Sequence, residues 1–90
     1  MELQDYFKFL KLEQIKRKNA EELPEGEKYF YTIHLLDYDN NPCRFFIFNK
    51  DLIDKILNLK LVGLQDVQCH LSVKYSSDAW RVNLLDVKVA

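Results

Sequence analysis

Four stretches of the chain are typical of β-strands, either because they are dense in aromatic and β-branched residues or because apolar residues recur with a period of two. They cover residues 29–36, 43–48, 67–75 and 80–89. The residues between the first two stretches favour a turn, because Asp and Asn side chains bond to their own backbone and Pro42 cannot donate to a ladder. The pattern therefore predicts four strands. The first two form an antiparallel hairpin, and a tight connection over residues 76–79 joins the last two.

Between the second and third of these strands, the apolar positions follow a helical period. One side of the segment carries Leu52, Ile53, Ile56, Leu57 and Leu61. This spacing predicts a short amphipathic helix. Asn49 is in position to cap its first turn, and Gly63 is in position to end it.

The first part of the chain supports two interpretations. Phe7 and Phe9 are followed by Leu10 and Leu12, which is the pattern of a strand that changes phase at a β-bulge, whereas residues 14–23 are rich in good helix formers. We predict a long strand over residues 6–17, because a long curved strand can serve two edges of a small sheet. A helix is the alternative. A second phase change, at Leu84–Leu85, predicts a bulge in the last strand.

Composition narrows the class of protein. Ninety residues fit one domain, 1–90, and 48% hydrophobic residues with only two Gly and two Pro exclude a disordered chain. The acidic start does not resemble a signal peptide and no apolar run is long enough to span a membrane, so we expect a cytoplasmic protein with reduced thiols. The net charge of −1 excludes a uniformly basic surface, so any binding of a polyanion must depend on where the charges lie.

Strand, strand, strand, helix, strand, strand is the element order of the OB-fold, a five-stranded, partly open barrel. Residues 28–89 resemble the small OB-fold single-stranded DNA-binding proteins of bacterial phages, plasmids and conjugative elements. The resemblance is carried by Phe30-Tyr31-Thr32-Ile33, by the turn 37–42, by Arg44-Phe45-Phe46-Ile47-Phe48 and by Trp80-Arg81-Val82-Asn83-Leu84-Leu85-Asp86-Val87. It implies an all-β fold with one helix and a single-stranded DNA or RNA ligand.

Alternation predicts which aromatic side chains are available to stack on bases. If Tyr31, Ile33 and Leu35 face the core, the outward side of the two strands carries Phe30, Thr32, His34, Leu36, Arg44, Phe46 and Phe48. We therefore predict a nucleic-acid-binding face that contains Phe30, His34, Arg44 and Phe46. Arg17, Lys18 and Arg81 are the basic residues that we expect to contact phosphates from the loops that OB proteins close over nucleic acid.

Other functions compete with this one. The same rings could pack under the N-terminal loop or between the subunits of a homo-oligomer. The nearly neutral charge also suits a protein-interaction OB module, an accessory factor that docks a helicase or relaxase in a replication or conjugation machine.

We predict no enzyme activity, no cofactor and no metal site. The serines lie outside a nucleophile elbow, and no Gly-rich phosphate loop is present. Cys69 and His70 are adjacent on a strand and point to opposite faces. Asp37, Asp39 and Asn41 imitate a calcium loop, but Pro42 replaces its glycine.

Overall fold

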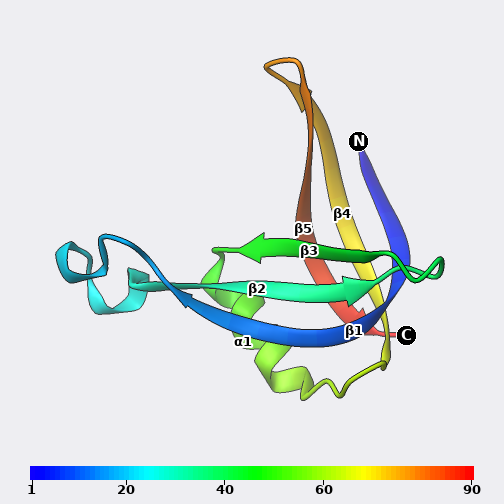
Figure 1. The fold of residues 1–90 in the computed structure, drawn as a ribbon, viewed down its shortest axis with the longest axis horizontal. Coiled ribbons are helices and arrows are strands. Elements are labelled where there is room, and N and C mark those ends of the chain that lie inside the picture. Colours follow the sequence, from blue (N-terminus) through cyan, green and yellow to red (C-terminus); the bar gives the residue numbers. More distant parts are fainter.

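The computed structural model describes residues 1–90 and contains one five-stranded antiparallel sheet and one α-helix (Figure 1). The strands are β1 (Glu2–Lys16), β2 (Tyr29–Leu36), β3 (Pro42–Ile47), β4 (Asp66–Ser76) and β5 (Ala79–Val89). Helix α1 (Lys50–Leu59) lies between β3 and β4, and two 3-10 turns, η1 (Ala20–Glu22) and η2 (Glu25–Glu27), lie between β1 and β2. The strand order in the sheet is β3-β2-β1-β4-β5, and every neighbouring pair is antiparallel. The predicted order of elements is confirmed.

Strand β1 is central because it pairs with two different strands along its length. Residues 2–8 pair with β4, residues 8–16 pair with β2, and the register of the β2 ladder shifts between Phe9 and Lys11. This is the predicted bulge, and it moves the inward phase from Phe9 to Leu12. The predicted start at residue 6 is too late, because pairing with β4 makes residues 2–5 strand although three of these four residues are polar. The helical alternative for residues 14–23 is realised only as the single turn η1.

The core lies between the inner face of the sheet and the apolar side of α1. Ile33, Leu35, Val67, Cys69 and Val87 have no exposed surface, and α1 adds Leu52, Ile53 and Ile56. Apart from Thr32, which is buried beside Ile33, the strand neighbours of these residues are exposed or partly exposed, as a sheet with one buried face requires.

Both ends of α1 are defined by local hydrogen bonds. The Asn49 side chain accepts from the backbone N–H groups of Asp51 and Leu52, at 2.9 and 3.3 Å, so the predicted N-cap is confirmed. The helix ends earlier than predicted, at Lys60, which adopts the left-handed conformation (φ 51°). Gly63 does not end it. The following residues return to β1, where the Leu64 N–H donates to the Phe9 carbonyl.

Strand β3 begins at Pro42, one residue before the predicted start, and ends at Ile47 rather than Phe48. Because β3 is an edge strand, the missing N–H of Pro42 costs no ladder hydrogen bond in the sheet interior. The second predicted bulge is also present. The β4–β5 register shifts so that His70 pairs with Asp86 and Leu71 pairs with Leu84, which leaves Leu85 unpaired.

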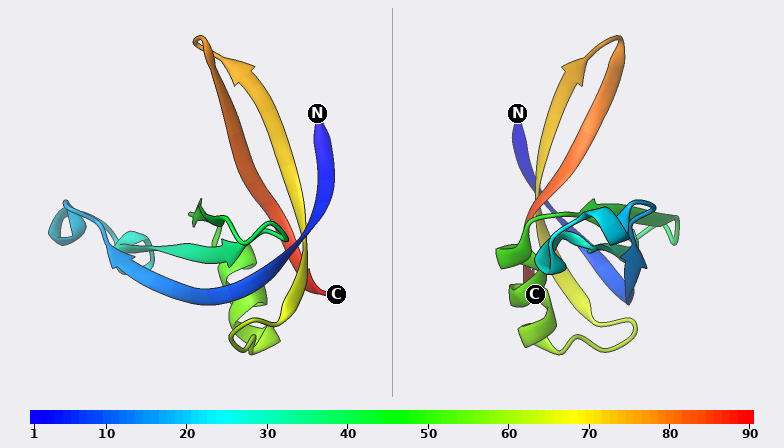
Figure 2. Two further views of the ribbon diagram at one scale, coloured as in Figure 1. Left: turned by 45° about the vertical axis from the view of Figure 1, so that its right-hand side comes forward. Right: turned by 90° about the vertical axis from the view of Figure 1, so that its left-hand side faces the viewer.

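The sheet bends sharply, so that the layer of β2 and β3 crosses the layer of β4 and β5 (Figures 1 and 2). Helix α1 lies against one side of both layers. The two ends of the sheet, β3 and β5, contact each other, but no hydrogen-bonded ladder joins them, so the sheet is open. The ten residues of α1 are too few, and too polar, for a helix to cross a membrane, and the structure has no other α-helix.

Candidate nucleic-acid interface

The side of β1, β2 and β3 that faces away from α1 presents residues in cross-strand rows; we call this side the outer face. Lys11, His34 and Arg44 form one row, because Lys11 pairs with His34 and His34 pairs with Arg44. The next row contains Glu13, Thr32 and Phe46, and the third contains Ile15 and Phe30. Directly opposite side chains in antiparallel strands lie about 4.5–5.5 Å apart at Cβ, so the members of a row are neighbours on the outer face.

Three phenyl rings and two guanidinium groups form a continuous series on the outer face. Phe30 is the centre: its ring centroid lies 5.1 Å from that of Phe48 in a stacked arrangement and 5.9 Å from that of Phe46 in an edge arrangement. Arg17 lies over Phe48 at 5.2 Å from the ring centroid, and Arg44 lies over Phe46 at 5.6 Å. We call this series the aromatic–arginine ladder; it consists of Arg17, Phe48, Phe30, Phe46 and Arg44.

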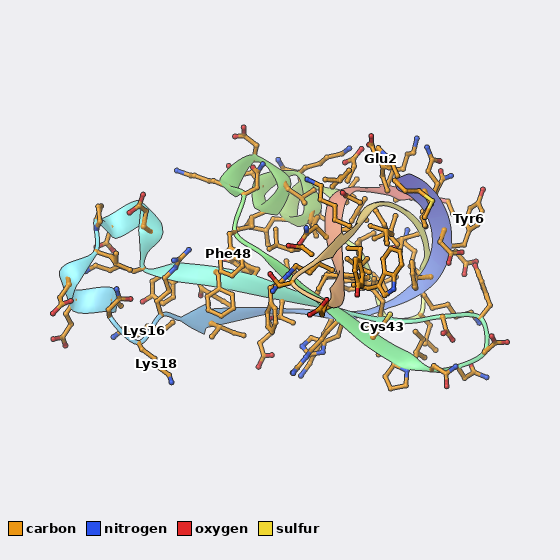
Figure 3. All side chains as sticks on the ribbon, turned by 90° about the horizontal axis from the view of Figure 1, so that it is seen from above. Glu2, Tyr6, Lys16, Lys18, Cys43 and Phe48 are labelled. Carbon is orange, nitrogen blue, oxygen red and sulfur yellow. The ribbon has the colours of Figure 1, made fainter.

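The outer rings of the ladder are open to solvent. Phe46 is 55% exposed and Phe48 is 60% exposed, whereas Phe30 is half-buried between them. Figure 3 shows Phe48 beside β2, where the chain leads from β3 into α1, with Lys16 and Lys18 nearer the loop that joins β1 to β2. Exposed phenyl rings grouped on one face leave their apolar area without a partner in the monomer.

Thr32 was expected to be exposed on this face and is instead 1% exposed. Its neighbours explain the difference, because Phe46 and Glu13 flank it across the strands and Phe30 and His34 flank it along its own strand. The Thr32 hydroxyl is buried and has no hydrogen-bond partner. Alternation correctly gave the direction of this side chain, but larger neighbours cover it.

The arginines of the ladder are not neutralised by carboxylates. The four ion pairs of the structure use Lys28, His34, Lys55 and His70 as their basic partners, and none uses Arg17, Arg44 or Arg81. Their positive charges are therefore available to an anionic ligand. The cation–π contacts orient two of these guanidinium groups without using up their charge.

Each arginine of the ladder lies beside a shallow depression. One, of about 220 Å³, is lined by His34, Pro42, Cys43 and Arg44. The other, of about 470 Å³, lies in the loop after β1 and is lined by Lys16, Arg17, Lys18, Asn19, Ala20, Glu21 and Glu22. The backbone N–H of Arg17 donates to the Lys28 carbonyl at 2.9 Å, which closes this loop at its base. The second depression carries both signs of charge, so its basic side is the one that fits a phosphate.

His34 belongs to the outer face but is already engaged. Its Nε2 lies 3.1 Å from Oε1 of Glu13, and the ring is mostly buried. Glu13 is therefore the one acidic side chain in the rows of the outer face, and the sequence prediction did not include it. The Glu13 carboxylate would repel a ligand phosphate at the centre of the face. The favourable phosphate sites therefore lie at the two ends of the ladder, beside Arg44 and Arg17.

The structure joins four of the seven predicted binding residues by direct contacts: Phe30, Phe46, Arg44 and Arg17. His34 lies in the same row as Arg44, and Lys18 lines the depression beside Arg17. Arg81 lies apart from the ladder, on β5 opposite Lys74, in a hairpin that projects away from β2 and β3 (Figure 2).

Phe48 is a member of the ladder that the predicted site omitted. The signal was present in the sequence, since Phe48 follows Phe46 by two positions and shares its phase. Among the residues of the structure, no group of three or more His, Cys, Asp or Glu side chains is arranged to hold a metal ion.

We compared the chain with models of protein families, with curated proteins and with solved structures, and none of the three comparisons gave a match.

Proposed function

We propose that this protein binds single-stranded DNA or RNA, with little preference for sequence, on the aromatic–arginine ladder. The observation that carries this function is the series of three contacting phenyl rings with an unpaired guanidinium at each end. Stacking of a base on an aromatic side chain contributes about 1–3 kcal/mol and is tolerant of sequence, because every base has a π-face.

The spacing of charge and ring suits a flexible polyanion. Bases would stack on the exposed faces of Phe46 and Phe48, and the phosphates between them would reach Arg44 and Arg17. Lys18, beside Arg17, would add positive charge at the loop end of the face. The net charge of the chain is −1, so attraction of the ligand depends on this local grouping and should weaken as salt rises.

An OB-fold barrel is the scaffold that we infer for this function. The order of elements, the β1 bulge and the contact between β3 and β5 support it. In such a barrel the ladder would lie on the ligand face of the second and third strands. Arg81 lies apart from the ladder, so it would contact only a ligand long enough to extend to the β4–β5 hairpin.

The function is tested by titrating the protein into a fluorescein-labelled oligothymidine of about 15 nucleotides, a length within the site size of one OB domain. We expect binding, and we expect Phe46→Ala to raise the dissociation constant about 5- to 150-fold while the melting temperature changes little, because Phe46 is 55% exposed. Tyr6→Ala is the matched control: this ring is 48% exposed, lies outside the ladder and should leave the affinity unchanged.

Arg44→Ala should act differently from Phe46→Ala. It removes a phosphate contact, so the affinity should fall for oligothymidine, oligoadenine and oligouridine alike, and the slope of log K against log salt should become shallower by about 0.7. If the protein binds no oligonucleotide, the nucleic-acid function is wrong. If it binds but Phe46→Ala and Arg44→Ala leave the affinity unchanged, the ladder is not the binding site. Without nucleic-acid binding, a protein-interaction module or a homo-oligomer that packs these rings between subunits would explain the exposed rings.

A further inference from the structure

The β4–β5 hairpin continues the apolar face of the core beyond the point where the core ends. Leu71 and Leu84 are paired and buried, and the next rows on the same face are Val73 with Val82 and Tyr75 with Trp80. The rings of Tyr75 and Trp80 lie 5.1 Å apart. Figure 1 shows that this end of the hairpin projects past β3 and α1, so no other element of the chain covers it.

The first residues of β1 extend the same surface. Leu3 pairs with Leu71, and the Val73 N–H donates to the Met1 carbonyl at 2.7 Å. We call the resulting surface the apolar stripe; it consists of Met1, Leu3, Val73, Tyr75, Trp80 and Val82. Within it Trp80 is 68% exposed, Tyr75 60% and Val82 44%.

The projecting part of the β4–β5 hairpin has one apolar face and one polar face. The face opposite the stripe carries Ser72, Lys74, Ser76, Arg81 and Asn83. A sheet with one apolar and one polar face is the pattern of a sheet that buries its apolar side. The strands stay paired to the tip, since Ser76 pairs with Ala79 around a two-residue turn in which Ser77 and Asp78 both have positive φ. The stripe is therefore a formed surface and not the side of a loose loop.

We propose that the apolar stripe is covered by the same stripe of a second copy of this chain, in a twofold-symmetric dimer. The six side chains of the stripe are uncharged, and the one charged group among these residues, the Met1 ammonium, donates to the Val73 carbonyl at 3.1 Å. An identical apolar face therefore complements the stripe. A twofold arrangement that brings the stripes together also turns the polar faces outward, so Lys74 and Arg81 of the two copies do not meet. This inference does not depend on the proposed nucleic-acid function.

The area of the stripe limits the affinity that we expect for the dimer. Large aromatic side chains bury about 150–250 Å² each, so the exposed parts of the six side chains amount to roughly 500 Å² per copy. A dimer would bury roughly 1,000 Å² in total, which is at the lower limit for a specific interface. We therefore expect a dimer whose population depends on concentration in about the micromolar range or above.

The dimer is tested with sedimentation velocity and with the emission of Trp80, the only tryptophan, over a wide range of protein concentration. We expect dimer formation together with a blue shift of the emission as the indole loses solvent. Val82→Lys should raise the dissociation constant of the dimer by at least ~100-fold, because it would place an unpaired ammonium in the interface twice. Asn83→Lys adds the same charge at the next residue, on the polar face, and should leave the dimer intact.

Three outcomes would overturn the proposal. They are a monomer with constant Trp80 emission at every concentration, a dimer that survives Val82→Lys, and a dimer lost equally in Asn83→Lys. A blue shift of Trp80 caused by oligothymidine while the protein stays monomeric would assign the stripe to nucleic acid instead. Melting temperatures of both lysine variants identify any loss of fold. Phe46→Ala should leave dimerisation unchanged, which separates this surface from the ladder.

Discussion

The Thr32 hydroxyl is buried beneath the outer face without a hydrogen-bond partner. A buried, unsatisfied hydroxyl costs about 1–3 kcal/mol, whereas an apolar group of the same shape costs nothing in hydrogen bonding. We expect Thr32→Val to raise the free energy of unfolding by about 1 kcal/mol, measured by urea denaturation with an unchanged m-value.

Thr32→Ala is the control for this substitution. It removes the same hydroxyl but leaves space where the side chain packed, so it should be less stable than Thr32→Val. If Thr32→Val instead lowers stability, the hydroxyl has a hydrogen-bond partner in solution, and the burial argument at this residue is wrong.

The two thiols differ in their surroundings. Cys69 has no exposed surface, and burial raises its pKa to about 12, with the nearby Cys43 thiol adding to the shift. Burial also raises the pKa of Cys43, which is only partly covered. Because the thiolate is the reactive form, a raised pKa slows reaction at neutral and mildly alkaline pH.

We therefore expect an aromatic disulfide reagent at pH 8 to label Cys43 slowly and Cys69 only on unfolding. Cys43→Ser should remove the native-state reaction completely. Rapid labelling of Cys69 in native protein would mean that its face of β4 is not the core face.

At the scale of single elements, the end of α1 gives a clear test. Lys60 holds the left-handed conformation that glycine adopts without steric cost, while Gly63 has no positive φ and open space around it. Lys60→Gly should raise the free energy of unfolding by about 0.5–1 kcal/mol, measured by thermal and urea denaturation. Gly63→Ala should change it by less than about 0.5 kcal/mol. A large loss of stability in Gly63→Ala, with no gain in Lys60→Gly, would restore Gly63 as the residue that ends the helix.

The elements that could be predicted are those whose pattern is local. The alternation in 29–36 and 67–75, the phase changes at Leu10 and Leu85 and the Asn49 cap all reflect interactions within a few residues, and all are present. The start of β1 could not be predicted in this way. Glu2, Gln4 and Asp5 carry no strand signal, and they become strand only because β4 supplies the hydrogen-bonding partner.

In the candidate site, too, some contacts follow from local sequence pattern and others depend on segments distant in the sequence. Alternation within β2 and β3 brings Phe30, Phe46 and Arg44 to one face, so their proximity could be anticipated. The contact of Arg17 with Phe48 could not be anticipated from local pattern, since it depends on the path of the loop after β1. Likewise, nothing local to His34 reveals that Glu13, on another strand, engages its ring.

On the scale of the whole molecule, the segment between β1 and β2 projects from the body with only two single-turn helices (Figure 1). Of its residues only Ala20 is buried, and Glu21, Glu22, Glu25 and Glu27 are exposed. A glutamate-specific protease should therefore cut within residues 21–27 first, as mass spectrometry of the products would show.

The nicked protein should stay assembled, because β1 remains paired with both β2 and β4 after the cut. Glu2 and Glu13, which are exposed but held in the β1 ladders, serve as internal controls and should resist cleavage. Early cutting at Glu13 would contradict the continuous strand and favour a mobile second half of β1.

The two-sided pairing of β1 has a consequence for how the chain reaches this structure. One half of β1 pairs with β2, the next strand in sequence, whereas its first residues can pair only after β4 has been made. The Met1 and Val73 backbones, which are hydrogen-bonded there, are 72 positions apart in the sequence. Closing so large a loop lowers the chain entropy before any stabilising contact has formed. We therefore expect slow folding, on the order of milliseconds to seconds. During synthesis the β1–β2–β3 half can assemble first, with Phe7 against Phe45, but Phe7 lacks its β4 partner Val67 until the residues of β4 have left the ribosome.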